Sequence, residues 1–183
     1  ILIDRAVFPG TQGGPLEHVI AAKAVSFLEA LQPSFKEYAK QIVLNAKALA
    51  NSLIKHGFTL QGGCTENHLI LINVQKSFGI DGKFYERALD LVGLTLNANA
   101  VPGDKCGAFR PSGVRLGTPA ITTLGMKESE MLQIADWMKQ VMDLCLRAGS
   151  EENLGSSEIK QDLEKIHQQV ITLSIKFKVP GIE

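Results

Sequence analysis

The sequence predicts an α/β or α+β fold in which helices cover one small sheet. Helical and strand-like segments alternate along the 183 residues, as expected when helices pack on a sheet. Apolar residues make up 45% of the chain, which is enough for a packed core and argues against disorder. The length suits one domain, or one domain with a piece of another.

Apolar periodicity and end signals predict two long helices in the first third of the chain. The first should begin at Pro15, because proline suits a first helical turn, and run to about Leu31. The second should begin at Ser34, which forms a capping-box pattern with Glu37, and end before Gly57.

The rest of the chain predicts shorter elements and one further long helix. Strand-like runs occupy residues 58–61, 68–74, 94–96 and 113–117. Helices are expected over residues 81–92, 127–147 and 157–171. The long one has one apolar face, formed by Met131, Ile134, Met138, Val141 and Cys145. Residues 148–156 are the best linker candidate.

Charge and cysteine usage exclude several classes of protein. Nineteen basic and nineteen acidic residues cancel, so we expect no general attraction for nucleic acid or for an anionic membrane. Cys64, Cys106 and Cys145 are widely spaced and form neither a metal-ligand pattern nor a disulfide framework. We therefore expect reduced thiols, no bound metal and a cytoplasmic location. No apolar run reaches the ~18 residues of a membrane span, and we expect a chain without a signal peptide.

The first eight residues, from Ile1 to Phe8, lack an initiator methionine and a helix cap. Their apolar side chains would need a neighbouring element to cover them. We expect a chain cut out of a longer one; a cleaved tag or a mature terminus is the alternative.

A glycine-rich segment precedes the first long helix. In Phe8-Pro9-Gly10-Thr11-Gln12-Gly13-Gly14-Pro15 the glycines would let backbone N–H groups approach a ligand, and the helix start offers a positive dipole end. Phosphate binding is one interpretation, and a plain turn into a helix is the other. The segment is neither a Walker A motif nor a dinucleotide fingerprint.

Two further segments could bind a ligand. Arg115 stands between Val114 and Leu116 on a short predicted strand, where a guanidinium could clamp a carboxylate. The alternative is a strand arginine paired at the surface. The segment from Asn97 to Asp104 carries amide side chains that could face a heterocycle, or it is an asparagine-rich turn. The four scattered histidines are interpreted as structural.

The order of these motifs resembles the serine hydroxymethyltransferase family. The motifs that carry the resemblance are FPGTQGGP at 8–15, HVIAAKA at 18–24, GGCTENH at 62–68, NAVP at 99–102 and SGVRLGTPAIT at 112–122. The resemblance covers residues 6 to about 145, and the motifs around Gly13 and Arg115 are specific to that family.

The resemblance implies the C-terminal part of an aspartate-aminotransferase-type pyridoxal-phosphate fold. Residues 1–33 would be the end of the large cofactor domain with a connecting helix, and residues 34–183 the small α/β domain. Gly13 and Gly14 would bind the cofactor phosphate of the neighbouring subunit, and Arg115 the carboxylate of serine or glycine. Asn99 would contact tetrahydrofolate, and Phe8 would line the folate site from the partner subunit. A homodimer or higher homo-oligomer follows.

The departures from the family pattern are equally specific. No lysine here lies in the family's Schiff-base segment, T-x-H-K-T-L, so we expect no catalytic residue in this chain and no activity from it alone. Thr11 stands where many relatives have glycine, and Glu17 where methionine or asparagine is common. Two alternatives stay open: a non-catalytic dimerisation or regulatory module (an inactive paralogue), and another same-fold pyridoxal enzyme such as a threonine aldolase.

Overall fold

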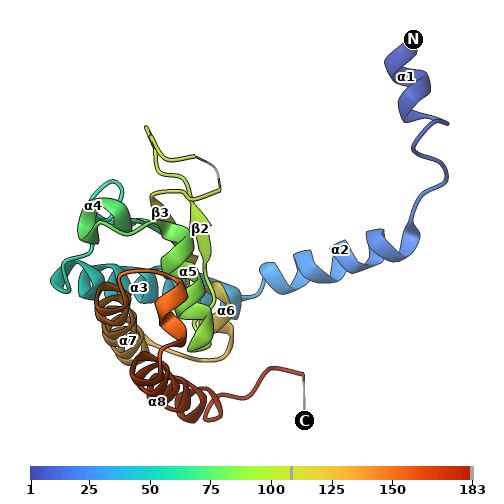
Figure 1. Cartoon of the computed structure of the whole chain (residues 1–183). Helices are drawn as coiled ribbons and strands as arrows, with labels where there is room; N and C mark the ends of the chain where they lie inside the picture. Colours follow the sequence, from blue (N-terminus) through green and yellow to red (C-terminus); the bar gives the residue numbers. More distant parts are fainter. Residues whose placement is uncertain (108, 182–183) are drawn as a thin grey trace. The chain divides into compact units, whose positions relative to one another are not determined.

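The computed structural model describes residues 1–107 and 109–181. The helices are α1 (Leu2–Val7), α2 (Glu17–Ala30), α3 (Pro33–Lys55), α4 (Val74–Phe78), α5 (Gly82–Leu91), α6 (Pro119–Thr123), α7 (Glu128–Ala148) and α8 (Ser157–Ser174), with a 3-10 turn, η1 (Glu152–Gly155) (Figure 1). The strands are β1 (Leu69–Asn73), β2 (Asn97–Asn99) and β3 (Gly113–Gly117). The chain forms two compact units, Ile1–Glu37 and Tyr38–Glu183.

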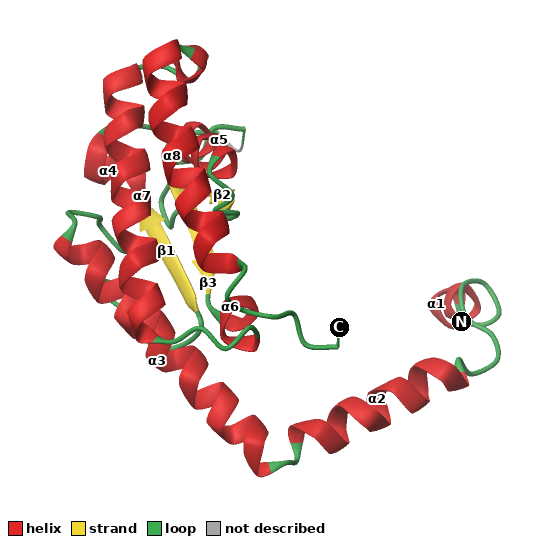
Figure 2. Cartoon of the chain, turned by 90° about the horizontal axis from the view of Figure 1, so that it is seen from below, coloured by secondary structure: helices red, strands yellow, loops and turns green. Residues whose placement is uncertain are grey.

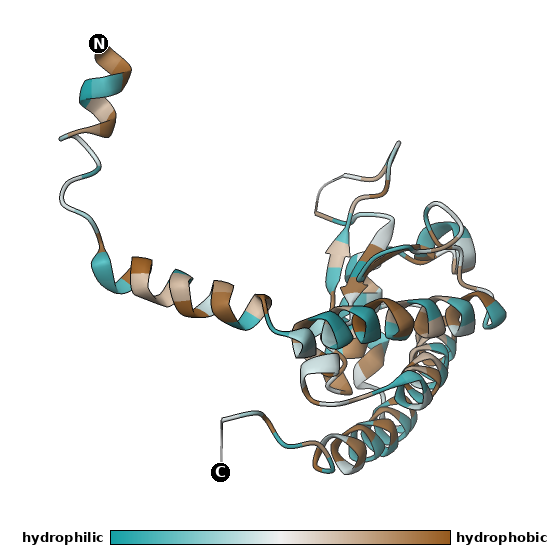
Figure 3. Cartoon of the chain, turned by 180° about the vertical axis from the view of Figure 1, so that it is seen from behind, coloured by the Kyte–Doolittle hydropathy of each residue, from teal (hydrophilic) through white to brown (hydrophobic). Residues whose placement is uncertain are grey.

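The first unit has no buried residue, and the apolar side chains of α1 and α2 are exposed. Hydrophobic residues colour parts of both helices brown in Figure 3. The turn after α1 is nevertheless well defined. The Thr11 hydroxyl donates to the carbonyl of Ala6 at 3.0 Å and is 3.2 Å from that of Val7. A Cβ at Gly10 would lie 2.5 Å from the Ala6 carbonyl oxygen, so this position requires glycine. Thr11 therefore caps a helix end.

The two long N-terminal helices form where the sequence predicts them, with small shifts at their ends. The α2 helix begins two residues after Pro15 and ends at Ala30. The α3 helix begins at Pro33 rather than Ser34, because proline is well suited to a first helical turn. Among the described residues, no helix is long and apolar enough to cross a bilayer.

The three strands of the second unit form an antiparallel sheet in the order β1-β3-β2. Side chains alternate between its two faces. Ile70, Ile72 and Val114 are fully buried on one face. The opposite face carries Leu71 and Arg115, which are cross-strand partners and are not buried. This helix-covered small sheet confirms the predicted α/β class.

Helices α3, α5, α7 and α8 supply the core that covers the buried face (Figure 2). The predicted apolar face of α7 is confirmed: Met131, Met138, Val141 and Cys145 are buried, and Ile134 packs against the core. Tyr85 of α5 is fully buried, and its hydroxyl donates to the Met138 carbonyl at 2.7 Å. Burial raises the pKa of the Cys145 thiol to about 12, whereas the other two cysteines are exposed, and all three are free.

Two of the four predicted strands are wrong. Residues 58–61 pair with β1 only at one bridge, between Leu60 and Ile72, because Gly62 and Gly63, both at positive φ, turn the chain away. Residues 94–96 are not a strand; Leu96 packs in the core, and the strand follows at Asn97–Asn99.

Two boundary predictions also change. The predicted strand at residues 68–74 ends at Asn73, whose side chain accepts from the Lys76 N–H at 2.8 Å and opens the unpredicted helix α4. Residues 148–156 are not a linker between compact units. They contain η1, where Leu154 is buried, and join α7 to α8 within the second unit. The last helix continues three residues beyond its predicted end, to Ser174.

Candidate functional site

Arg115 lies at the centre of β3, on the face of the sheet that the helices leave open. It pairs across the ladders with Asn97 of β2 and with Leu71 of β1. The neighbouring Val114 points into the core and anchors the strand. Strand alternation thus directs the guanidinium away from the core while the backbone beneath it is held on both sides.

The guanidinium of Arg115 has no carboxylate partner within residues 1–107 and 109–181. The other three arginines of the second unit are paired: Arg87 with Glu151, Arg110 with Asp81 at 3.0 Å, and Arg147 with Glu158 and Asp162. A surface-paired arginine was the alternative to a carboxylate clamp. The described acidic side chains supply no such pair, so Arg115 remains available to an external anion.

Amide side chains lie beside Arg115 on the same face. Asn97 is exposed and directly opposite Arg115, and Asn99, which is half-buried, pairs with Gly113. The register therefore brings Asn99 and Arg115, both predicted site residues, onto one open surface. Asn97 belongs to the segment whose amides were predicted to face a heterocycle, but it was given no role of its own, and the strand register places it opposite Arg115.

Two carboxylates hold the backbone around these side chains. Glu86 of α5 accepts the N–H of Ala98, in the middle of β2, at 2.9 Å. Burial opposes ionisation of Glu86, but hydrogen bonds from Lys83 and from the Ala98 N–H outweigh it and lower the pKa. Asp104 lies in the loop between β2 and β3, where hydrogen bonds from the Ser112 hydroxyl and N–H hold its pKa well below the ordinary value.

The other predicted site residues lie in the first unit. The backbone N–H groups of Gly13 and Gly14 donate to no acceptor within the described part of the chain. They line an open cavity of about 460 Å³ together with Gln12, Pro15 and Lys23. Phe8, which ends α1, has 65% of its surface exposed.

The glycine segment fits a phosphate group. Two free amides, the start of the 14-residue helix α2 and the cation of Lys23 are the partners that an anion requires. Glu17 in the first turn of α2 opposes this, because its charge is negative. A phosphate group at this position would therefore be held mainly by the backbone amides.

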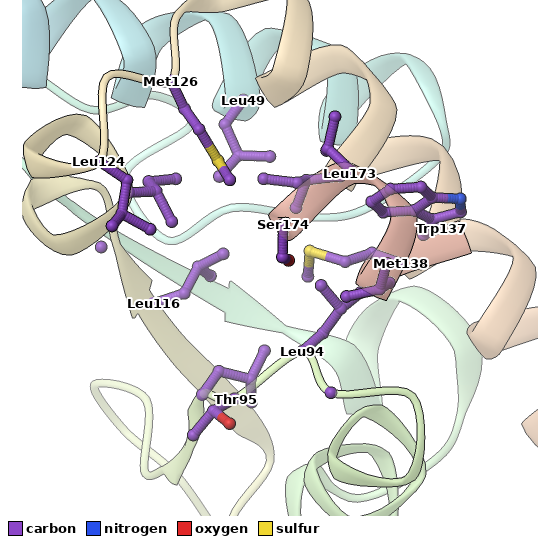
Figure 4. A pocket seen from close by; sticks show the side chains of 16 residues that line it. Leu49, Leu94, Thr95, Leu116, Leu124, Met126, Trp137, Met138, Leu173 and Ser174 are labelled. Atoms are coloured by element: carbon purple, nitrogen blue, oxygen red, sulfur yellow. The ribbon is translucent and has the colours of Figure 1, made fainter. Parts of the chain in front are cut away.

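The second unit also contains an apolar cavity of about 280 Å³ on the opposite side of the sheet (Figure 4). Leu116, the neighbour of Arg115, lines it together with Met126 and Trp137. The Trp137 indole N–H already donates to Gln169 at 2.8 Å. None of the predicted site residues lines this cavity, and its apolar walls do not suit a charged amino acid.

These observations define a class of module: a small sheet covered by helices on one face, with an arginine on the other face that has no ion-pair partner among the described residues. The family model for serine hydroxymethyltransferase matches residues 2–138. A serine hydroxymethyltransferase of Acidobacterium capsulatum is 47% identical over 179 residues, which cover 98% of this chain and 39% of that protein. One of Acidothermus cellulolyticus is also 47% identical, over 181 residues that cover 99% of this chain and 41% of that protein.

The chain therefore belongs to the serine hydroxymethyltransferase family, as its motifs predicted. It spans about two fifths of the length of these curated relatives. Its small antiparallel sheet and surrounding helices agree with the C-terminal part of the family's fold.

Proposed function

We propose that this chain is the C-terminal part of an enzyme that converts serine and tetrahydrofolate to glycine and 5,10-methylenetetrahydrofolate, and the reverse. The observation that carries the proposal is the unpaired guanidinium of Arg115 on an open sheet face. Family membership supports it, because both relatives are named for this activity. It also argues against a threonine aldolase.

The role proposed for Arg115 is to bind the carboxylate of serine or glycine. A planar guanidinium can bind both carboxylate oxygens at once, which fixes the position and the orientation of the amino acid. Because β3 is paired with a strand on each side, the backbone of Arg115 is held in a fixed position. Such positioning favours the reaction by holding the bond to be broken in a productive orientation.

The proposed cofactor is pyridoxal phosphate, with Gly13 and Gly14 as ligands of its phosphate. When bound, this group acts as an electron sink for the bond that breaks at the substrate α-carbon. The residues of this chain contribute binding: two backbone amides toward the phosphate, and Arg115 toward the substrate. The T-x-H-K-T-L context of the family's cofactor lysine is not found in the sequence, and so we propose that the chain is inactive alone.

Folate binding and assembly complete the proposal. Asn99 would contact tetrahydrofolate through its amide, from the same sheet face as Arg115. Phe8 would line the folate site of the neighbouring subunit, and its exposed ring is available for that contact. A homodimer or higher homo-oligomer follows, because Phe8 and the glycine segment would serve the site of a second subunit. The proposed location is the cytoplasm.

The test is to replace Arg115 by alanine in the longer polypeptide that contains this chain. We expect the KM for serine to rise strongly, by the equivalent of about 2–5 kcal/mol, because a substrate carboxylate loses its charged partner. The KM for tetrahydrofolate should change much less. Arg147→Ala, which removes an arginine paired with Glu158, is the matched control. Normal serine kinetics in Arg115→Ala would contradict the proposal.

A further inference from the structure

The Asp104 carboxylate accepts four hydrogen bonds from its own loop. One oxygen, Oδ2, accepts from the Val101 N–H at 3.2 Å and from the Ser112 N–H at 2.9 Å. The other, Oδ1, accepts from the Cys106 N–H at 2.9 Å and from the Ser112 hydroxyl at 2.6 Å. All four donors belong to the connection between β2 and β3, so this one carboxylate links several parts of that connection through hydrogen bonds.

These donors stand at the two ends of the loop. Val101 follows β2 by two residues, and Ser112 directly precedes β3. Oδ2 therefore joins the backbone that leaves one strand to the backbone that enters the next. The β2 strand is only three residues long and lies at the edge of the sheet. A pairing this short is weak by itself. Asp104 reinforces it at the loop end by holding the Val101 and Ser112 N–H groups together.

The strands that Asp104 joins carry the two candidate ligand-binding side chains of this unit. Asn99 lies two residues before Val101, and Arg115 lies three residues after Ser112. The backbone at Gly113, between Ser112 and Arg115, is tightly packed. A Cβ at this position would lie 2.6 Å from the Ile72 carbonyl oxygen and 2.7 Å from the Val101 side chain. A displacement of the loop end would therefore shift both Asn99 and the start of β3.

We propose that Asp104 is a positioning residue that sets the location of Arg115 relative to Asn99, and hence of the serine carboxylate relative to the folate. This rests on the proposed function. Asp104 acts through the backbone of Val101 and Ser112 and does not touch either substrate. Serine affinity and folate affinity are thereby coupled through one carboxylate in the loop.

Asparagine cannot replace this carboxylate. An ionised aspartate offers two acceptor oxygens, whereas an asparagine amide offers one oxygen and an NH₂ group that only donates. Two of the four donors would face that NH₂ group. Asp104→Asn therefore keeps the shape of the side chain but removes the connection at one of its oxygens, and Ser112→Ala removes only the hydroxyl bond to Oδ1.

The experiment measures both Michaelis constants in the longer polypeptide. For Asp104→Asn we expect the KM for serine and the KM for tetrahydrofolate to rise together by about 10-fold or more, because small misplacements of binding groups are costly. We expect kcat to change much less, and Ser112→Ala to show the same pattern with a smaller rise. Asp90→Asn, an exposed acid on α5, is the control and should keep wild-type values.

A merely structural role predicts a different result: a lower kcat from a smaller folded fraction, with both KM values unchanged. That result in Asp104→Asn, or in Ser112→Ala if the first variant does not fold, would overturn the inference. If Arg115→Ala raises the KM for serine while Asp104→Asn leaves both constants unchanged, the proposed function stands and the inference fails. Absence of serine turnover in the wild-type longer polypeptide would overturn the proposed function itself.

The second measurement needs no substrate. Amide hydrogen exchange of the 183-residue chain should show faster exchange at Ala98, Arg115 and the other paired amides of β2 and β3 in Asp104→Asn. The amides of α7, which bond within the helix, should keep their protection because they lie outside the loop. Unchanged exchange throughout β2 and β3 would overturn the inference, whatever the kinetics show.

Discussion

Gly82 packs directly against the carbonyl of Gly113: a Cβ built on Gly82 would lie 1.9 Å from that oxygen. The Gly82 N–H also donates to the Pro111 carbonyl at 2.7 Å. The first turn of α5 is thereby in contact with the backbone that enters β3, the strand of Arg115. Glycine at position 82 allows this approach, because it carries no side chain.

We predict that Gly82→Ala destabilises the chain by about 3 kcal/mol, at the upper end of the range for overpacking, because backbone must move. The direction of the stability change is informative, since replacing glycine by alanine at an ordinary helical position would stabilise the chain by up to about 1 kcal/mol. Urea unfolding checks this. Gly155→Ala is the control, because a Cβ there meets nothing within 4 Å. Equal midpoints for the two variants would contradict the contact.

Gly14→Val should leave the fold of the 183-residue chain intact. A Cβ at Gly14 meets nothing within 4 Å, so stability should change by less than about 0.5 kcal/mol, as at ordinary surface positions. In the longer polypeptide, however, we expect weaker pyridoxal phosphate binding and a weaker dimer, because the side chain obstructs the amides and a ligand shared between subunits stabilises assembly.

Titration of the apo protein with pyridoxal phosphate, followed by absorbance and sedimentation, measures both effects of Gly14→Val. Gly155→Val, at another open glycine outside the proposed site, is the matched control. Unchanged cofactor affinity together with an intact dimer would remove the glycine segment from the cofactor site.

The 183-residue chain alone is expected to show no conversion of serine to glycine. It has one proposed wall of the site and no lysine in the family's cofactor context. The assay uses purified chain with added pyridoxal phosphate and tetrahydrofolate, and the longer polypeptide is the positive control. Conversion of serine to glycine by a purified chain whose intact mass has been confirmed would show that this expectation is wrong.

Acid should weaken the start of α7. The Lys127 N–H donates to the Glu130 carboxylate at 2.7 Å, and this bond lowers the pKa of Glu130. A lowered folded-state pKa gives stability that is present above the unfolded value of about 4.3 and is lost as pH falls through the folded value. We expect Glu130→Gln to cost about 0.5–1 kcal/mol at pH 7, and less at pH 3. Urea midpoints at the two pH values measure this, and a cost that does not shrink in acid would contradict it.

The elements that the sequence predicts well are those whose signals are local. The β3 strand has its predicted bounds, because glycines flank an apolar alternation around Arg115. The α7 helix follows from an apolar stripe of helical period over 21 residues.

The β2 strand could not be predicted in the same way. It consists of Asn97, Ala98 and Asn99, which have low strand propensity. It forms because β3 supplies the ladder and Glu86 accepts the Ala98 N–H, and both partners are distant in sequence. Residues 94–96 resembled a strand better, but Leu96 packs in the core and Leu94 packs against it without a strand ladder.

In the candidate site, too, local motifs could be predicted, whereas features that depend on residues distant in sequence could not. Arg115 and Asn99 could be named from motifs, whereas their shared face depends on the register. With nineteen acidic residues in the chain, no sequence pattern could indicate that Arg115 has no carboxylate partner within residues 1–107 and 109–181. The role of Asp104 was equally hidden, since one of its partners, Ser112, lies eight residues away across the loop.

Because of the register of the sheet, an odd or even residue number tells which face of the sheet a strand residue lies on. In all three strands odd-numbered residues face away from the core, and even-numbered ones face into it or toward it. Substitutions at 97, 99 and 115 should thus alter the proposed ligand-binding surface without disturbing the core, whereas those at 70, 72 and 114 should change stability without reaching that surface. Natural variation could therefore retune ligand preference on one side of this sheet while the other side stays under selection for packing alone.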